Sequence, residues 1–119
     1  MIHLGPLSGQ RIVGTGAAVP RDLDPTCPEL DTAAALAALG ATHPDADRWG
    51  VDRRQWVALP EDPAAIDVED LAVAAADRAL RDAGIDVELV IVATSTPNRI
   101  SAALAARVAR RLGHRGASV

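Results

Sequence analysis

The strongest constraint on the fold is an unbroken apolar run, Leu-Val-Ile-Val at 89–92, set between two predicted helices. A run of this length without polar alternation indicates a strand covered on both faces, as in a parallel sheet packed between helices. The preceding helix is predicted over Asp67–Ala83, with Asp67 as its N-cap and Gly84 as its end. The following helix is predicted over Ser101–Leu112, and a further strand begins close after it. This alternation predicts a layered α/β fold, with a mixed sheet and covering helices.

The first half of the chain carries weaker signals. Arg11–Val13 is a short strand candidate, and the Gly14-Thr15-Gly16 that follows it is predicted to form a tight turn. A helix is predicted over Glu29–Leu39, where apolar residues recur at helical spacing. Arg53–Leu59 is predicted to be a strand or an extended arm. With 119 residues and no internal repeat or linker, the chain forms one domain at most.

Composition excludes several classes of function. The net charge is −4 and the isoelectric point about 5.2, so the chain has no general electrostatic reason to bind nucleic acid. No apolar run approaches the roughly 20 residues of a membrane span, and the N-terminus lacks the pattern of a signal peptide. A single cysteine, Cys27, excludes an internal disulfide and fits a reducing compartment. The expected location is the cytoplasm.

Two groups of residues that invite a cofactor or metal role lack the pattern that such a role requires. Gly14-Thr15-Gly16 is followed by Val19 and Pro20 where a dinucleotide fingerprint needs a third glycine and the start of a helix. His3, His43 and His114 show no metal-ligand spacing and are expected to be exposed loop residues. We therefore expect no metal and no tightly bound cofactor.

Hydroxyl and guanidinium groups cluster around the last predicted helix. Thr94-Ser95-Thr96 lacks the glycines of a hydrolase nucleophile elbow, so these hydroxyls are expected to satisfy backbone groups between strand and helix. Four arginines lie near the C-terminal end of that helix: Arg107, Arg110, Arg111 and Arg115. We interpret them as helix-end cations on a solvated face. The alternative is a surface that docks an acidic carrier protein or the phosphates of coenzyme A.

Three blocks of sequence, in order, resemble the N-terminal part of one enzyme family. They are IVGTGAAVP at 12–20, RWGVDRRQWVALPED at 48–62, and the stretch 70–117 with its Ala-Gly-Ile helix ending, Val-Ala-Thr-Ser-Thr-Pro turn and Leu-Gly-x-x-Gly-Ala close. The family is the 3-oxoacyl-ACP synthase III group of initiating ketosynthases, in the thiolase superfamily. The resemblance implies that residues 1–119 form the N-terminal part of a thiolase-like ketosynthase domain, with no second domain.

The same resemblance implies a chemistry whose central residues lie beyond the matching region. In the family a cysteine, aided by histidine and asparagine, takes an acyl group from acyl-CoA and condenses it with a malonyl unit on acyl carrier protein. No catalytic residue is assigned to this chain, because Cys27 falls before the first helix and far from the nucleophile's expected place. The resemblance also implies a homodimer in the full-length enzyme, and the chain alone is expected to be inactive.

The mouth of the coenzyme A channel is the one family site that matches positions in this chain. Arg48 stands where the family's Arg-Thr-Gly-Ile motif has the arginine that contacts the nucleotide end of coenzyme A. The family's adenine-stacking tryptophan, just upstream, is matched by Pro44. Trp49 is a candidate replacement because any aromatic face can stack on a base. Acyl-CoA is therefore expected as a substrate, contacted by Arg48 and Trp49.

Three functional hypotheses remain open at this level. The first is the N-terminal portion of a 3-oxoacyl-ACP synthase III-like ketosynthase in fatty-acid or polyketide biosynthesis, completed by the remainder of the enzyme or by a partner chain. The second is a non-catalytic short chain that folds against a partner subunit. The third is an acyltransferase of the thiolase superfamily that shuttles acyl groups without extending them.

Overall fold

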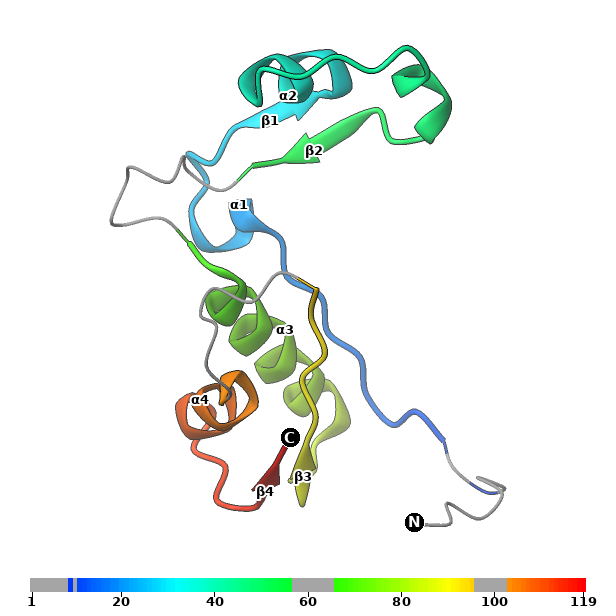
Figure 1. Cartoon of the computed structure of the whole chain (residues 1–119). Helices are drawn as coiled ribbons and strands as arrows, with labels where there is room; N and C mark the ends of the chain where they lie inside the picture. The colour runs from blue at the N-terminus through cyan, green and yellow to red at the C-terminus, as the bar shows by residue number, and fades with distance from the viewer. Residues whose placement is uncertain (1–8, 10, 57–65, 96–102) are drawn as a thin grey trace, which may run out of the picture.

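The structure is a computed structural model that describes residues 9, 11–56, 66–95 and 103–119. Figure 1 shows two groups of elements, which we call the upper lobe (α2, η1, β1 and β2) and the lower lobe (α3, α4, β3 and β4). The described elements are, in chain order, α1 (Pro20–Leu23), β1 (Glu29–Asp31), α2 (Thr32–Ala38), the 3-10 helix η1 (Ala46–Trp49), β2 (Arg53–Gln55), α3 (Val68–Ala83), β3 (Leu89–Val90), α4 (Leu104–Arg111) and β4 (Ala117–Ser118).

The longest element, α3, begins and ends where the sequence predicts. Asp67 is the N-cap: its carboxylate accepts a hydrogen bond from the Asp70 N–H, and the Asp70 carboxylate accepts one from the Asp67 N–H. Such a capping box satisfies two backbone donors that a helix start leaves unpaired. At the other end Gly84 takes the left-handed conformation, with φ of 65°, that a glycine adopts without steric cost.

The predicted apolar strand pairs in parallel with the end of the chain. β3 and β4 pair with Leu89 opposite Ala117, and two further 3.0 Å backbone bonds join Val119 to Val90 and Val92. α4 connects the two strands and packs against both, which makes a β-α-β unit. The expected burial on both faces is wrong for this chain, because Leu89 and Ile91 are 48% and 69% exposed. Only the face of β3 toward α4 is covered.

In the upper lobe the predicted helix over Glu29–Leu39 begins later than expected. Glu29–Asp31 forms β1, which pairs antiparallel with β2 so that Glu29 lies opposite Gln55. The helix α2 begins at Thr32, and Asp31 caps it by accepting a hydrogen bond from the Ala34 N–H. The predicted strand over Arg53–Leu59 is confirmed for Arg53–Gln55, and residues 57–59 lie outside the described part.

Residues 11–19 run alongside α3 as an extended segment (Figure 1), and the strand predicted for Arg11–Val13 does not form. Ile12 and Val13 are exposed, and no described strand runs beside them to complete a ladder. Gly14-Thr15-Gly16 is not a tight turn either. The Thr15 N–H donates to the Asp82 carboxylate of α3 at 2.9 Å, and a Cβ on Gly14 would lie 2.6 Å from the Ala79 carbonyl oxygen. These glycines therefore serve close approach to the helix.

The described residues bury little apolar surface for their number. Five of the described residues are buried: Cys27, Ala35, Ala105, Val108 and Ala109. The most deeply buried of them is Val108, which is 1% exposed. A core of such small side chains agrees with an alanine-rich composition that lacks Phe and Tyr. Among the described helices, none is long and apolar enough to cross a membrane.

Candidate functional site

Both residues predicted to contact the nucleotide end of coenzyme A lie on η1, at the far end of the upper lobe. Trp49 is the last residue of this short helix, and Gly50 ends it in the left-handed conformation with φ of 64°. The turn leaves the Arg48 side chain 84% exposed and Trp49 44% exposed, as a guanidinium beside an aromatic ring. The Arg48 guanidinium forms an ion pair with Asp45 at 3.4 Å, one 3-10 turn earlier.

Two further side chains surround the Trp49 indole, and sequence reasoning assigned neither to the site. The His43 ring centroid lies 5.0 Å from that of Trp49, with the rings tilted by 49°. The Arg54 guanidinium carbon lies over the indole, 5.8 Å from its centroid. Residue alternation along β2 is the one signal that could have separated Arg54 from its neighbours Arg53 and Gln55, because alternate strand residues face opposite sides.

A hollow of about 300 Å³ adjoins this surface on the side of α2. His43 forms part of its wall, and the other lining residues are Thr32, Ala33, Leu36, Ala37, Ala41, Thr42 and Ala46. Its lining is mostly aliphatic and contains no carboxylate or thiol. The hollow can therefore accept apolar groups, and the His43 ring is the general base in its lining.

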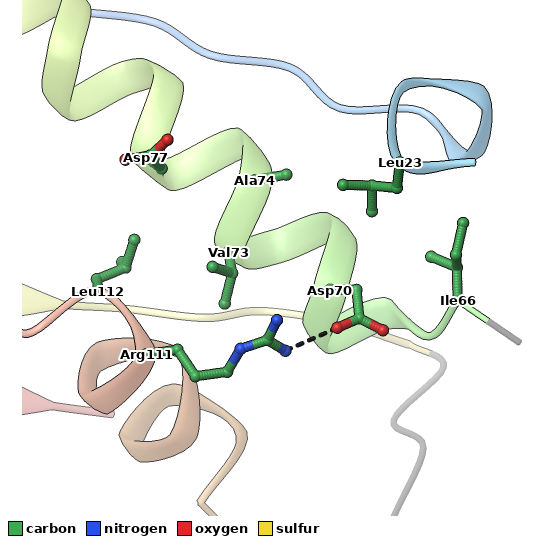
Figure 2. Close-up of a pocket in the computed structure, with 8 residues that line it drawn as sticks. All are labelled: Leu23, Ile66, Asp70, Val73, Ala74, Asp77, Arg111 and Leu112. Atoms are coloured by element: carbon green, nitrogen blue, oxygen red, sulfur yellow. Dashed lines mark hydrogen bonds and ion pairs between the residues drawn. The ribbon is translucent and has the colours of Figure 1, made fainter. Parts of the chain in front are cut away.

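A second hollow, of about 390 Å³, lies between α1, α3 and α4 (Figure 2). Its apolar wall comes from Leu23, Ile66, Val73, Ala74 and Leu112, while Asp70, Asp77 and Arg111 line it with charge. In Figure 2 the Arg111 guanidinium reaches across to Asp70, at 2.8 Å. Asp77 forms an ion pair with Arg81. Because each of these charged side chains already has a counter-ion, we interpret the hollow as a gap between packed helices and not as a catalytic pocket.

The arginines predicted as a basic cluster divide into two kinds. Arg107 and Arg111 both bind Glu69 of α3, at 2.6 and 3.4 Å, and thereby join α3 to α4. Arg110 and Arg115 remain on the exposed surface. The interpretation as helix-end cations on a solvated face is thus confirmed for the exposed Arg110 and Arg115. It is wrong for Arg107, which lies within α4 and is largely buried against Glu69, a contact that sequence spacing could not show.

The remaining candidates from the sequence are not brought together. Cys27 is buried, and its N–H donates to the Asp24 carbonyl oxygen at 3.0 Å. His43 is exposed, as predicted, whereas the His114 ring is half-buried, with a buried Nε2. Within the described ranges no three metal-ligating side chains converge. His3, Thr96 and the 57–62 part of the second sequence block lie outside the described residues.

Comparison with known proteins identifies relatives of one kind. The chain is 37% identical over 118 residues to β-ketoacyl-[acyl-carrier-protein] synthase III 2 of Streptomyces coelicolor, an alignment that covers 96% of this chain and 32% of that protein. It is 39% identical over 114 residues to the β-ketoacyl-[acyl-carrier-protein] synthase III of Desulfitobacterium hafniense, covering 90% of this chain and 30% of that protein. The chain thus spans about a third of the length of these relatives. No family model matches the sequence.

Solved structures agree with the sequence relatives. The priming β-ketosynthase of the R1128 polyketide pathway superposes with a TM-score of 0.62 at 26% identity, over 92% of this chain and 31% of that one. The 3-oxoacyl-(acyl carrier protein) synthase III of Pseudomonas aeruginosa PAO1 gives 0.58 at 31% identity, over 90% and 31%.

By fold, the chain is a partial α/β unit of the thiolase-like class. Within that class it is related over most of its length to the 3-oxoacyl-ACP synthase III family, as the three sequence blocks predict.

Proposed function

We propose that this chain forms the N-terminal part of an initiating ketosynthase, a 3-oxoacyl-ACP synthase III-like enzyme of fatty-acid or polyketide biosynthesis. The observation that carries the proposal is the match to synthases of this kind over 90–96% of the chain, at 37–39% identity. The exposed outer face of β3 supports it, because Leu89 and Ile91 would be covered by further elements of a larger fold.

The proposed reaction has two steps. In the first step a cysteine thiol attacks the thioester carbonyl of acyl-CoA, and its proton passes to the departing sulfur. The products of this step are an acyl-cysteine on the enzyme and free coenzyme A. Malonyl-ACP then loses CO2, and the resulting carbanion attacks the acyl-cysteine carbonyl, which releases 3-oxoacyl-ACP and the cysteine thiolate. Dividing the transfer between two thioesters replaces one difficult step by two easier ones. The cysteine and its histidine and asparagine helpers are not assigned to residues 1–119.

The residues of this chain would act in binding. We assign Arg48 and Trp49 to the nucleotide end of acyl-CoA, which is a substrate and not a tightly bound cofactor. A guanidinium is suited to phosphate, and an indole face is suited to stacking on a purine. The support is their adjacency on η1 and their exposure, which leaves both side chains open to a ligand.

The proposed partners follow from the same reaction. Acyl carrier protein delivers the malonyl unit, and the enzyme works as a homodimer in the cytoplasm, where acyl-CoA and acyl carrier protein occur together. The names of the relatives support the carrier protein, since each is an acyl-carrier-protein synthase.

The test is acyl transfer by the native protein as its host makes it, purified with any chain or subunit that accompanies it. Radiolabelled acyl-CoA is supplied with and without malonyl-ACP, and we expect labelled 3-oxoacyl-ACP together with released CO2. Label that reaches another acceptor thiol without loss of CO2 would support the acyl-shuttling alternative. A polypeptide of 12.3 kDa that purifies with a separate partner chain and shows no acyl transfer would support the non-catalytic alternative.

A further inference from the structure

We infer that His43 and Arg54 are positioning residues for acyl-CoA, which hold the Trp49 indole in place as a preformed stacking surface for the nucleotide base. The inference rests on the proposed function, since it assigns a mechanism to the same binding surface. Neither residue belongs to η1: His43 lies in the loop before it and Arg54 lies on β2. The indole is thus held by contacts from both sides of η1 in the chain.

The Arg54 guanidinium is held in place by hydrogen bonds that are independent of its contact with the indole. Its Nη1 donates to the Thr32 hydroxyl at 2.6 Å and to the Val51 carbonyl oxygen at 3.3 Å, and the Thr32 hydroxyl donates to the same carbonyl at 2.6 Å. These bonds tie the guanidinium to the first residue of α2. From this anchored position its Cζ lies 5.8 Å from the Trp49 centroid, within the distance at which a cation is attracted to an aromatic face.

His43 holds the indole from the loop. Its Nδ1 accepts a hydrogen bond from the Asp45 N–H at 3.2 Å, which fixes the orientation of the ring. The centroid separation of 5.0 Å and the tilt of 49° fall in the range where aromatic pairs attract each other. The Asp45 carboxylate in turn pairs with Arg48. One short loop therefore orients both members of the proposed nucleotide contact.

Because of these contacts, the Trp49 side chain is already held in one orientation before the nucleotide binds. A surface side chain that is free to rotate loses this freedom on binding, at a cost to affinity. Trp49 keeps 44% of its surface exposed while two neighbours restrict its rotation. Removal of either neighbour should weaken binding of the nucleotide and leave the chemical step unchanged.

The experiment compares two thioester substrates in the native protein as its host makes it. Acyl-CoA carries the nucleotide, whereas acyl-phosphopantetheine keeps the reactive thioester and lacks the adenosine. For His43→Ala and Arg54→Gln we expect the KM for acyl-CoA to rise roughly threefold to tenfold with kcat unchanged. Both constants for acyl-phosphopantetheine should stay at their wild-type values.

A matched control is Arg53→Gln, on the adjacent residue of β2. Arg53 is exposed on the opposite face, where it forms an ion pair with Glu29, so neither substrate should be affected. A double variant that combines Arg54→Gln with Trp49→Ala should show no higher KM for acyl-CoA than Trp49→Ala alone, because Arg54 acts through the indole.

Equal losses for both substrates would overturn the inference and leave these residues a structural role only. Unchanged acyl-CoA kinetics in both variants would overturn it as well. If Arg54→Gln fails to fold, His43→Ala makes the same test, because His43 is an exposed loop residue. A wild-type protein that does not accept acyl-CoA at all would refute the proposed function itself, before any variant is compared.

Discussion

Two glycines, Gly14 and Gly16, allow an extended segment to lie directly on α3. A Cβ on Gly14 would come within 2.6 Å of the Ala79 carbonyl oxygen and of the Ala83 nitrogen, and a Cβ on Gly16 would also meet the helix backbone. Helix backbone cannot rotate away as a flexible side chain can. The Arg78 guanidinium adds to the contact by donating to the Ala17 carbonyl and to Asp22.

Gly16→Ala should therefore destabilise the native protein by about 1–3 kcal/mol, the usual effect of an added methyl group in a filled space. The measurement is the urea midpoint of unfolding at constant m-value. Arg11→Ala on the same segment is the control, because Arg11 is exposed and its loss should change stability by less than about 0.5 kcal/mol. An unaltered urea midpoint for Gly16→Ala would contradict the close approach of this extended segment to α3.

At the residue scale, the sequence predicts candidate binding residues better than it predicts which side chains contact them in space. Arg48 is singled out because it matches a family position and Trp49 because it is an aromatic residue next to Arg48, and the structure leaves both exposed. Arg54 could not be assigned, since its contact with Trp49 depends on an anchor at Thr32, 22 positions away. Gly14 and Gly16 were predicted to form a turn because glycine alone does not reveal whether it serves rotation or close approach.

At the scale of elements, α3 and α4 are joined by a small network of charges. Glu69 of α3 accepts from Arg107 at 2.6 Å and from Arg111 at 3.4 Å, and Arg111 also reaches Asp70. The side chains of Arg107 and Glu69 are only 17% and 13% exposed, so this pair is largely withdrawn from water. The hydrogen bond from Arg107 lowers the pKa of Glu69 below its ordinary value of 4.5.

The sign of the resulting pH dependence follows from that shift. In acid the unfolded chain, with the ordinary pKa, binds a proton more readily than the folded chain. The stabilisation is therefore complete above about pH 4.5 and is lost as the pH falls through the folded pKa. Arg107→Gln should destabilise the native protein by about 1–3 kcal/mol at pH 7. The difference from wild type should shrink below pH 4.5.

Thermal unfolding at pH 7 and at pH 3 measures this prediction. Arg110→Gln is the matched control, since Arg110 occupies the same helix on its exposed side. A gap between Arg107→Gln and wild type that is equal at both pH values would show that packing, and not charge, joins the two helices.

Element boundaries were predictable where the signal is local. The ends of α3 follow from Asp67 and Gly84, because caps act within one helical turn. Glu29–Asp31 was predicted to be helical because its apolar spacing continues that of α2. Pairing with Arg53–Gln55 makes this segment a strand instead. Such a non-local contact cannot be predicted from a short window of sequence.

At the scale of the whole molecule, 119 residues are spread more widely than a self-contained domain of this length. The radius of gyration is 17.5 Å, against roughly 13–14 Å expected for a compact domain of this length. The accessible surface is 9191 Å², against about 6,100 Å² for a folded monomer of this mass. The layered α/β class was predictable from the order of the elements, whereas the incomplete cover of β3 was not.

Prepared alone, residues 1–119 should therefore bind a hydrophobic dye such as ANS and unfold over a broad range of urea. The physical reason is the small core, with five buried residues among those described. Dye fluorescence and the urea m-value are the measurements, with a compact protein of similar length as the reference. A steep two-state transition without dye binding would show that these residues are a complete folding unit.

The parallel pairing of β3 with β4 has a consequence for synthesis on the ribosome. The partners Leu89 and Ala117 are 28 residues apart, so β3 emerges well before β4 exists. At about 5–20 residues per second, the apolar run at 89–92 waits roughly 1–6 seconds without its neighbouring strand. Chaperones that hold nascent apolar segments would meet this stretch during that interval, and a slower codon between the two strands would lengthen the wait.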